Sequence, residues 1–128
     1  MSADMEENVL ELQGVVMTFG GLMALSNLNF NVRRGMIKSI IGPNGAGKTT
    51  LFNVITGSFP PTQGTVKFKG QPIQHLKAHK IADRGISRTF QTVELFGNMT
   101  VLENVMLGCY TRIRTSFLAS GFVLPRSR

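Results

Sequence analysis

The first part of the chain alternates between apolar and polar positions in a pattern that predicts a β-hairpin. Apolar residues recur over residues 9–17, and over residues 24–32 apolar positions alternate with three asparagines. Such alternation places the two kinds of side chain on opposite faces, as in a half-buried strand. Gly20 and Gly21 lie between the two runs. We therefore expect two antiparallel strands joined by a glycine turn.

The pattern that follows predicts shorter elements of mixed type. A mostly apolar run over residues 36–41 indicates a strand, and a glycine-rich run separates it from apolar residues at helical spacing over residues 48–55. Further along, the pattern predicts strands over residues 65–69 and 86–90 and helices over residues 75–83 and 101–110. Thr100 and Glu103 have the spacing of a capping box at the start of that last helix. The tail from Thr111 mixes basic and apolar residues and fits a second short helix.

The glycine-rich run carries the strongest chemical signal in the chain. It matches the pattern G-x-x-x-x-G-K-[ST] with Gly42, Pro43, Asn44, Gly45, Ala46, Gly47, Lys48 and Thr49, and Thr50 follows. Glycines let backbone N–H groups point at phosphate oxygens, the lysine adds a positive charge, and the threonine hydroxyl is a ligand for Mg²⁺. The following helix presents its positive end to an anion. A glycine turn with an incidental lysine is the alternative, but the predicted strand–loop–helix context argues against it.

The charge of the chain fits a phosphate ligand without identifying one. There are 14 Lys and Arg against 7 Asp and Glu, for a net charge of +7, and four of the acids precede Gly14. A basic protein attracts nucleotides, nucleic acids or anionic lipids alike. No aromatic-interleaved RNA-binding motif or zinc-finger spacing is present, so no nucleic-acid partner is expected. A nucleic-acid-binding protein remains an alternative, and it predicts steeply salt-dependent binding that survives Lys48→Ala.

Several other classes are disfavoured by what the chain contains. The single cysteine, Cys109, cannot form an internal disulfide, which fits a reducing compartment, and its apolar setting favours a buried thiol. No apolar run approaches the ~18 residues of a membrane-spanning helix, and the acidic start does not resemble a signal segment. His75 and His79 are four residues apart, but no third ligand is evident, so solvated histidines are expected rather than zinc. The base-reading motifs of GTPases are absent.

The motifs taken together resemble one family. The runs Phe19-Gly20-Gly21, Gly42 to Thr50, Ser87-Arg88-Thr89-Phe90-Gln91 and Met99 to Val105 are similar to those of ATP-binding-cassette (ABC) transporter subunits. Those of branched-chain amino-acid importers are the most similar, and the basic tail resembles an insertion in that group. The resemblance covers the chain from Val9 onward. It implies an α/β P-loop NTPase fold, as an N-terminal half with an antiparallel β subdomain and an incomplete parallel sheet. Residues 1–128 would form a single partial nucleotide-binding domain.

The resemblance also implies roles for individual residues. Phe19 would stack on the adenine of ATP, although a core phenylalanine at a strand end is the alternative. The residues from Gly42 to Thr50 would bind the phosphates. Thr49 and Gln91 would contact Mg²⁺, although Gln91 could equally be an ordinary loop residue. Residues 92–98 would face the permease. The implied partners are transmembrane permease subunits and a second ATP-binding subunit, on the cytoplasmic face of the inner membrane.

The acids that ATP hydrolysis needs are not evident. After Lys48 the chain has only Asp83, Glu94 and Glu103, and none follows an apolar strand as the Mg²⁺-binding acid of a phosphate-loop ATPase does. The signature motif and the switch histidine of ABC proteins are also absent. We therefore expect a chain that is truncated before the signature motif and the Walker B acid and has no catalytic residue of its own. It should bind nucleotide weakly at best and not hydrolyse ATP alone.

Two functions follow from these observations. The first is an ATP-binding subunit, or a fragment of one, that couples ATP binding and hydrolysis to the import of branched-chain amino acids. The alternative is a non-catalytic nucleotide-binding fragment or regulator, which follows from the missing acid. ATP turnover by the purified chain would eliminate that alternative. No residue here identifies the transported substrate.

Overall fold

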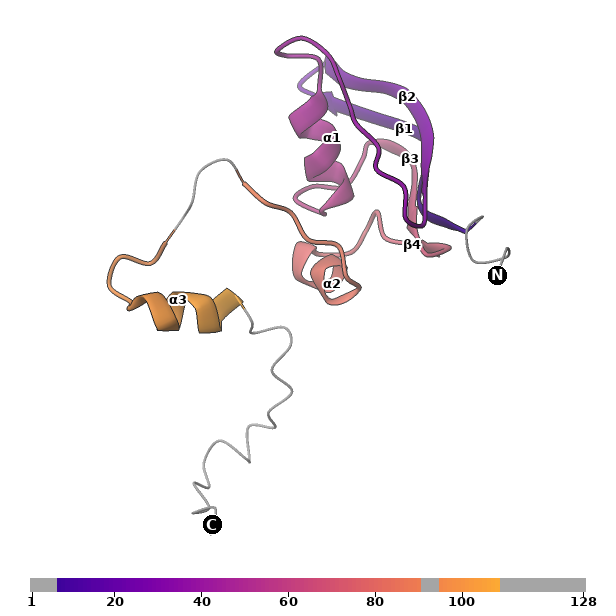
Figure 1. Cartoon of the computed structure of the whole chain (residues 1–128). Helices are drawn as coiled ribbons and strands as arrows, with labels where there is room; N and C mark the ends of the chain where they lie inside the picture. Colours follow the sequence, from indigo (N-terminus) through magenta and orange to yellow (C-terminus); the bar gives the residue numbers. More distant parts are fainter. Residues whose placement is uncertain (1–6, 91–94, 109–128) are drawn as a thin grey trace. The chain divides into compact units, whose positions relative to one another are not determined.

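The computed structural model describes residues 7–90 and 95–108, which fall into two compact units (Figure 1). The first unit is Met1–Arg88 and the second is Thr89–Arg128. No helix among these described residues is long and apolar enough to cross a membrane. The first unit contains the glycine-rich loop.

The first unit is built on an antiparallel sheet of four strands. They are β1 (Asn8–Phe19), β2 (Leu22–Arg33), β3 (Gln63–Phe68) and the short β4 (Gln71–Pro72), in the order β2-β1-β3-β4. Phe19 pairs with Leu22 across the glycine turn, and the pairing runs back to Asn8 and Arg33. The predicted hairpin and the predicted antiparallel subdomain are therefore confirmed.

A β-bulge in β1 explains an irregularity in its apolar pattern. Leu12 and Val15 are both buried although they are three residues apart, a spacing that would put them on opposite faces of a regular strand. Gly14, with φ of +61°, lies between them where the register shifts, and the extra residue returns Val15 to the buried face. The Gly14 N–H donates to Asn29 Oδ1 at 2.7 Å, so the bulged backbone keeps a partner.

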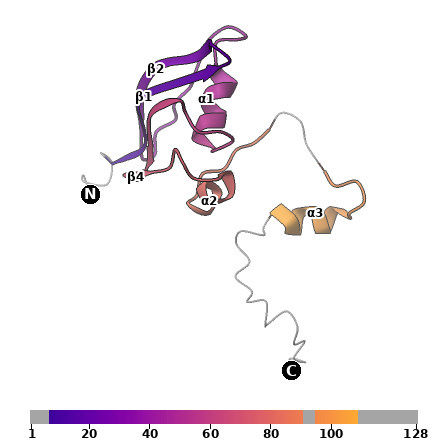
Figure 2. The same cartoon turned by 180° about the vertical axis from the view of Figure 1, so that it is seen from behind.

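Two helices belong to this unit, α1 (Lys48–Ile55) and α2 (Ala78–Asp83). The bounds predicted for the first are confirmed, whereas α2 begins three residues later than predicted. The reason is a turn ahead of α2, in which the Leu76 N–H donates to the Ile73 carbonyl at 2.9 Å. The α1 helix lies beside one face of the sheet in both views (Figures 1 and 2).

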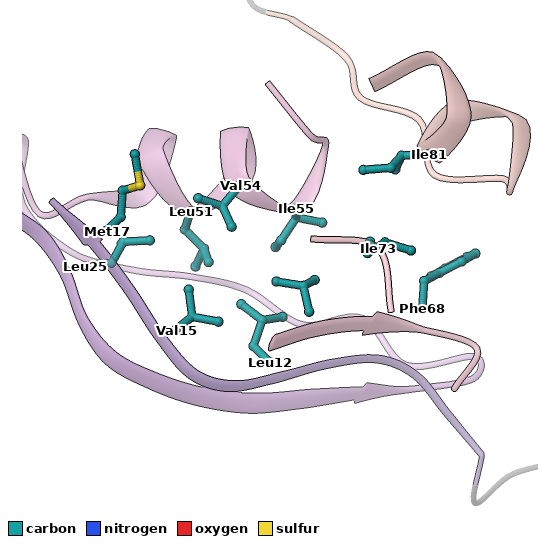
Figure 3. Close-up of a cluster of buried hydrophobic side chains, with 11 residues drawn as sticks. Leu12, Val15, Met17, Leu25, Leu51, Val54, Ile55, Phe68, Ile73 and Ile81 are labelled. Carbon is teal, nitrogen blue, oxygen red and sulfur yellow. The ribbon is translucent and has the colours of Figure 1, made fainter. Parts of the chain in front are cut away.

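A single apolar cluster fills the space between α1, α2 and the sheet (Figure 3). The α1 helix contributes Leu51, Val54 and Ile55, which follow its apolar stripe, and α2 contributes Ile81. The sheet contributes mainly alternate residues of β1 and β3. The complete set is Leu12, Val15, Met17, Leu25, Leu51, Val54, Ile55, Val66, Phe68, Ile73 and Ile81. The core thus holds α1 in place against the sheet.

Two predicted strands are wrong. Residues 36–41 and 86–90 form no strand, and Ile37 and Ile41 are each 94% exposed. A strand needs a hydrogen-bonded neighbour, and all strand pairs among the described residues are antiparallel pairs within the β2-β1-β3-β4 sheet. The parallel neighbours that a phosphate-loop fold would place beside residues 36–41 are not among them. The apolar run over residues 36–41 therefore does not form a strand among the described residues.

The second unit contains α3 (Val101–Gly108), which begins with the predicted capping box. Glu103 Oε2 accepts hydrogen bonds from the Thr100 N–H at 2.7 Å and from Thr100 Oγ1 at 2.8 Å, and the Glu103 N–H donates to Thr100 Oγ1 at 3.3 Å. These bonds from the Thr100 backbone and hydroxyl lower the pKa of Glu103. The predictions for Tyr110, for Cys109 and for a helix in the tail lie outside the described residues.

Candidate nucleotide-binding site

The glycine-rich loop forms a tight turn that leads directly into α1. The Ala46 N–H donates to the Pro43 carbonyl at 3.2 Å, and Gly45 has φ of +85°, as the third residue of a type II turn requires. Gly47, with φ of +83°, is the N-cap of α1, and its carbonyl accepts from the Leu51 N–H at 2.9 Å. Two of the motif's glycines therefore hold backbone conformations that other residues adopt only with strain.

Gly47 also brings the loop into direct contact with β2. A Cβ atom at this position would lie 2.4 Å from the Ala24 carbonyl oxygen and 3.0 Å from Leu25 Cδ2. Only a glycine allows the loop and the strand to come this close. By contrast, a Cβ on Gly45 would meet nothing within 4 Å, so this part of the loop faces open space. The loop is thus supported by the sheet on one side and accessible on the other.

Lys48 spans the loop that precedes it. Its half-buried side chain donates from Nζ to the carbonyls of Gly42, at 2.5 Å, and Pro43, at 2.6 Å. An ammonium group has three N–H donors, so one remains for a ligand. The two bonds hold the charge at the mouth of the loop, beside the first turn of α1.

The start of α1 is suited to an anion. It has no side-chain cap and no acidic residue in its first turn. Its first backbone N–H groups have no carbonyl four residues earlier within the helix, and the helix dipole adds partial positive charge there. With the free donor of Lys48, these groups match the oxygens of a polyphosphate. Thr49 is exposed and Thr50 half-buried, so the Thr49 hydroxyl is accessible to a cation at the phosphates.

The described residues offer no carboxylate ligands for a metal ion beside the loop. Asp83 is the only described acid between Lys48 and Arg88, and it forms a surface ion pair with Lys80 at 3.9 Å. Over residues 7–90 and 95–108 no three His, Cys, Asp or Glu side chains come together as metal ligands, and His75 and His79 are both exposed. The residues present therefore fit a triphosphate, and of those described only Thr49 fits its metal.

Phe19 is the last residue of β1, beside the glycine turn, and is not part of the buried core. Its side chain is 44% exposed, and its ring meets that of Phe59 edge to face, with the centroids 5.3 Å apart. Its partner Phe59 packs against the core beneath α1, so the contact places the ring of Phe19 on that side of the sheet. The exposed ring is thus on the side of the sheet that carries α1 and its loop.

Gln91 lies outside the described residues, as do residues 92–94 of the loop expected to face the permease. The segment just before Gln91 is fixed to α1 by Arg88. Its guanidinium donates to Asn53 Oδ1 and lies 5.9 Å from the centroid of the Phe52 ring. We did not assign Arg88 a role from the sequence, although it belongs to the Ser87–Gln91 run.

A basic hollow lies away from the loop. It has a volume of about 470 Å³ and is lined by Glu7, Val9, Val32, Arg33, Arg34, Gly35, Met36 and Lys69, without any residue of the glycine-rich run. The sequence indicated only a turn at Arg33 and Arg34. Three cations line this hollow against one carboxylate, that of Glu7, so it is a competing place for an anion in the first unit.

A glycine-rich loop with this spacing of residues that leads directly into a helix is typical of a P-loop nucleotide-binding domain, although the residues before the loop form no strand here. Residues 25–125 match the sequence model described as "ABC transporter", so the chain belongs to the ABC transporter family. The predicted resemblance and fold class are confirmed. Proteins of this family bind ATP, usually with Mg²⁺.

Curated relatives point to one group within the family. The chain is 46% identical to the high-affinity branched-chain amino acid transport ATP-binding protein BraF of Pseudomonas aeruginosa and 41% identical to LivG of Escherichia coli K12, which carries the same description. Each match covers 97% of this chain and 49% of the relative, so the chain spans about half their length. The structure is also similar to the ADP conformation of MJ1267, an ATP-binding cassette of an ABC transporter. The TM-score is 0.73 at 38% identity, covering 92% of this chain and 46% of that one.

Proposed function

We propose that this chain is the nucleotide-binding part of an ATP-binding subunit of an ABC importer for branched-chain amino acids. In that role it would couple the binding and hydrolysis of ATP to transport. The observation that carries the proposal is the loop itself, with Gly47 against β2 and Lys48 bonded across Gly42 and Pro43. The names of BraF and LivG support the substrate class.

In this proposal, different groups of the loop bind different parts of ATP and its metal ion. The backbone N–H groups of Gly45 and of residues 47–50 donate to phosphate oxygens, while the Ala46 N–H closes the turn on Pro43. The third N–H of Lys48 donates to the terminal phosphates. Thr49 holds Mg²⁺ through its hydroxyl, with Gln91 as a further contact. Mg²⁺ bound there would supply positive charge that offsets part of the charge on the phosphates. Phe19 offers its exposed ring to the adenine.

We further propose that residues 1–128, acting alone, bind ATP without turning it over. To hydrolyse ATP, a phosphate-loop ATPase needs an acidic residue that binds Mg²⁺, and most of these enzymes also need a group that orients the attacking water. Of the acids after Lys48, Asp83 is paired with Lys80 and Glu103 with Thr100, while Glu94 lies outside the described residues. This supports a partial domain that lacks the Walker B acid. It also keeps the second function, a non-catalytic nucleotide-binding fragment or regulator, open to test.

The partners proposed for the complete subunit follow from its family. They are transmembrane permease subunits and a second ATP-binding subunit, on the cytoplasmic face of the inner membrane. The apolar residues that α3 exposes, including Val101, Leu102 and Val105, are available for such contacts.

The test is titration calorimetry of the purified chain with ATP and Mg²⁺. Lys48→Ala should weaken binding at least tenfold, because it removes a charge at the phosphates. Lys80→Ala is the matched control, since it removes a surface lysine of the same unit and should leave the dissociation constant within about twofold. Equal effects of the two substitutions would refute a site at the loop. Binding of DNA or RNA that survives Lys48→Ala would favour the nucleic-acid alternative.

A further inference from the structure

Two phenylalanine rings meet beside the glycine turn of the β1–β2 hairpin. Phe19 is the last residue of β1, and Phe59 lies in the loop between α1 and β3. Their ring centroids are 5.3 Å apart and their planes cross at 90°. This edge-to-face arrangement is favoured because the positive edge of one ring meets the negative face of the other.

The two rings differ in how firmly they are held. Phe59 is half-buried and packs against the apolar core, whereas Phe19 keeps 44% of its surface exposed. Phe19 is also followed directly by Gly20 and Gly21, which restrict their neighbour very little. The core therefore fixes Phe59, and the contact with Phe59 restricts the orientation of Phe19.

Phe19 is close to the phosphate loop along the strand ladder. It pairs with Leu22 of β2, and Gly47 abuts the carbonyl of Ala24 two residues further along the same strand. At about 3.4 Å per residue this separation is about 7 Å along the strand. A base attached to phosphates on the loop can reach a ring at that place.

We propose that Phe59 is a positioning residue for nucleotide binding. It holds the ring of Phe19 in the orientation in which its free face stacks on the adenine base. This inference rests on the proposed nucleotide site. A ring that is already oriented loses less freedom when the base binds, so the contact raises affinity for the base without touching the ligand.

The experiment compares two ligands that share phosphates but differ in the base. Dissociation constants for ATP and for inorganic tripolyphosphate, both with Mg²⁺, are measured by calorimetry on the chain and on Phe59→Leu, Phe19→Leu and the double variant. Leucine keeps an apolar side chain and removes the ring. Phe30→Leu is the control, because Phe30 is a half-buried phenylalanine elsewhere in the sheet.

We expect Phe59→Leu to weaken ATP binding about 3- to 10-fold, the range of one aromatic contact, and to change tripolyphosphate binding by less than about twofold. In the Phe19→Leu background the same substitution should have little further effect, because the ring that it orients is already gone. Phe30→Leu should leave the ratio of the two constants unchanged.

Three results would overturn the inference. They are unchanged ATP affinity in Phe59→Leu, an equal loss for ATP and tripolyphosphate, and effects of Phe59→Leu and Phe19→Leu that simply add. If the unsubstituted chain binds tripolyphosphate as tightly as ATP, no base site exists and the inference fails while the phosphate site stands. If it binds neither ligand, the proposed function itself fails.

Discussion

Because Gly47 lies so close to β2, we expect alanine to destabilise the protein more at Gly47 than at Gly45 in the same loop. Gly45 and Gly47 have nearly equal φ angles, +85° and +83°, so an alanine at either position suffers similar backbone strain. That strain is about 1–2 kcal/mol in the left-handed region. The two sites differ in space, since a Cβ on Gly45 meets nothing within 4 Å and one on Gly47 lies 2.4 Å from the Ala24 carbonyl oxygen.

The added cost at Gly47 comes from that overlap. The loop or β2 would have to move by more than half an ångström, and both are backbone next to the core residue Leu25. Forcing an extra carbon into a packed region costs about 1–3 kcal/mol. We therefore expect Gly47→Ala to lower the free energy of unfolding by about 2–5 kcal/mol, and Gly45→Ala by about 1–2 kcal/mol.

Urea denaturation followed by circular dichroism measures both values. The two variants should keep the slope of the unmodified chain, so that a change in midpoint reports stability. The difference between them, about 1–3 kcal/mol, corresponds to about 1 M urea at the usual slopes. Equal midpoints for Gly45→Ala and Gly47→Ala would refute the close packing of the loop on β2.

Two further predictions concern the core and the second unit. Ile81 is 1% exposed and Ile37 is 94% exposed. In urea denaturation, Ile81→Ala should therefore lower the free energy of unfolding by about 2–5 kcal/mol and Ile37→Ala by less than about 0.5 kcal/mol. Similar losses for the two variants would contradict the described core. Because the pKa of Glu103 is lowered by its bonds from Thr100, the capping box should stabilise α3 at neutral pH and be lost as the pH falls through that lowered pKa. Thr100→Ala removes the hydroxyl bond and keeps the larger contribution of the backbone N–H, so an NMR titration should show the Glu103 pKa rising only part of the way to its ordinary value. An unchanged pKa would argue against the hydroxyl's part in the box.

The parts of the fold that the sequence predicted well are those set by local pattern. Alternation defined the hairpin, helical spacing gave the bounds of α1, and the pair Thr100 and Glu103 marked the start of α3. In each case the cause lies in residues that are close together in the sequence, which form either one apolar face or a helix cap. The bulge at Gly14 also has a local cause in the sequence, because a glycine within an apolar strand often marks a bulge.

The errors arose where the structure depends on distant partners. Residues 36–41 are apolar enough for a buried strand, but a parallel strand exists only with neighbours that lie far away in sequence. The site shows the same limit. The motif identified the loop residues, whereas the contacts of Gly47 with Ala24, of Arg88 with Asn53 and of Phe19 with Phe59 bring together distant segments. Only the fold could reveal them.

Backbone amide NMR during a titration with ATP and Mg²⁺ tests most directly whether ATP binds at the glycine-rich loop. We expect the largest shifts on Gly45, Gly47 and Thr49, with further shifts at Phe19. Shifts concentrated instead at Arg33 and Lys69, with the loop unchanged, would place the anion in the basic hollow and refute binding at the loop.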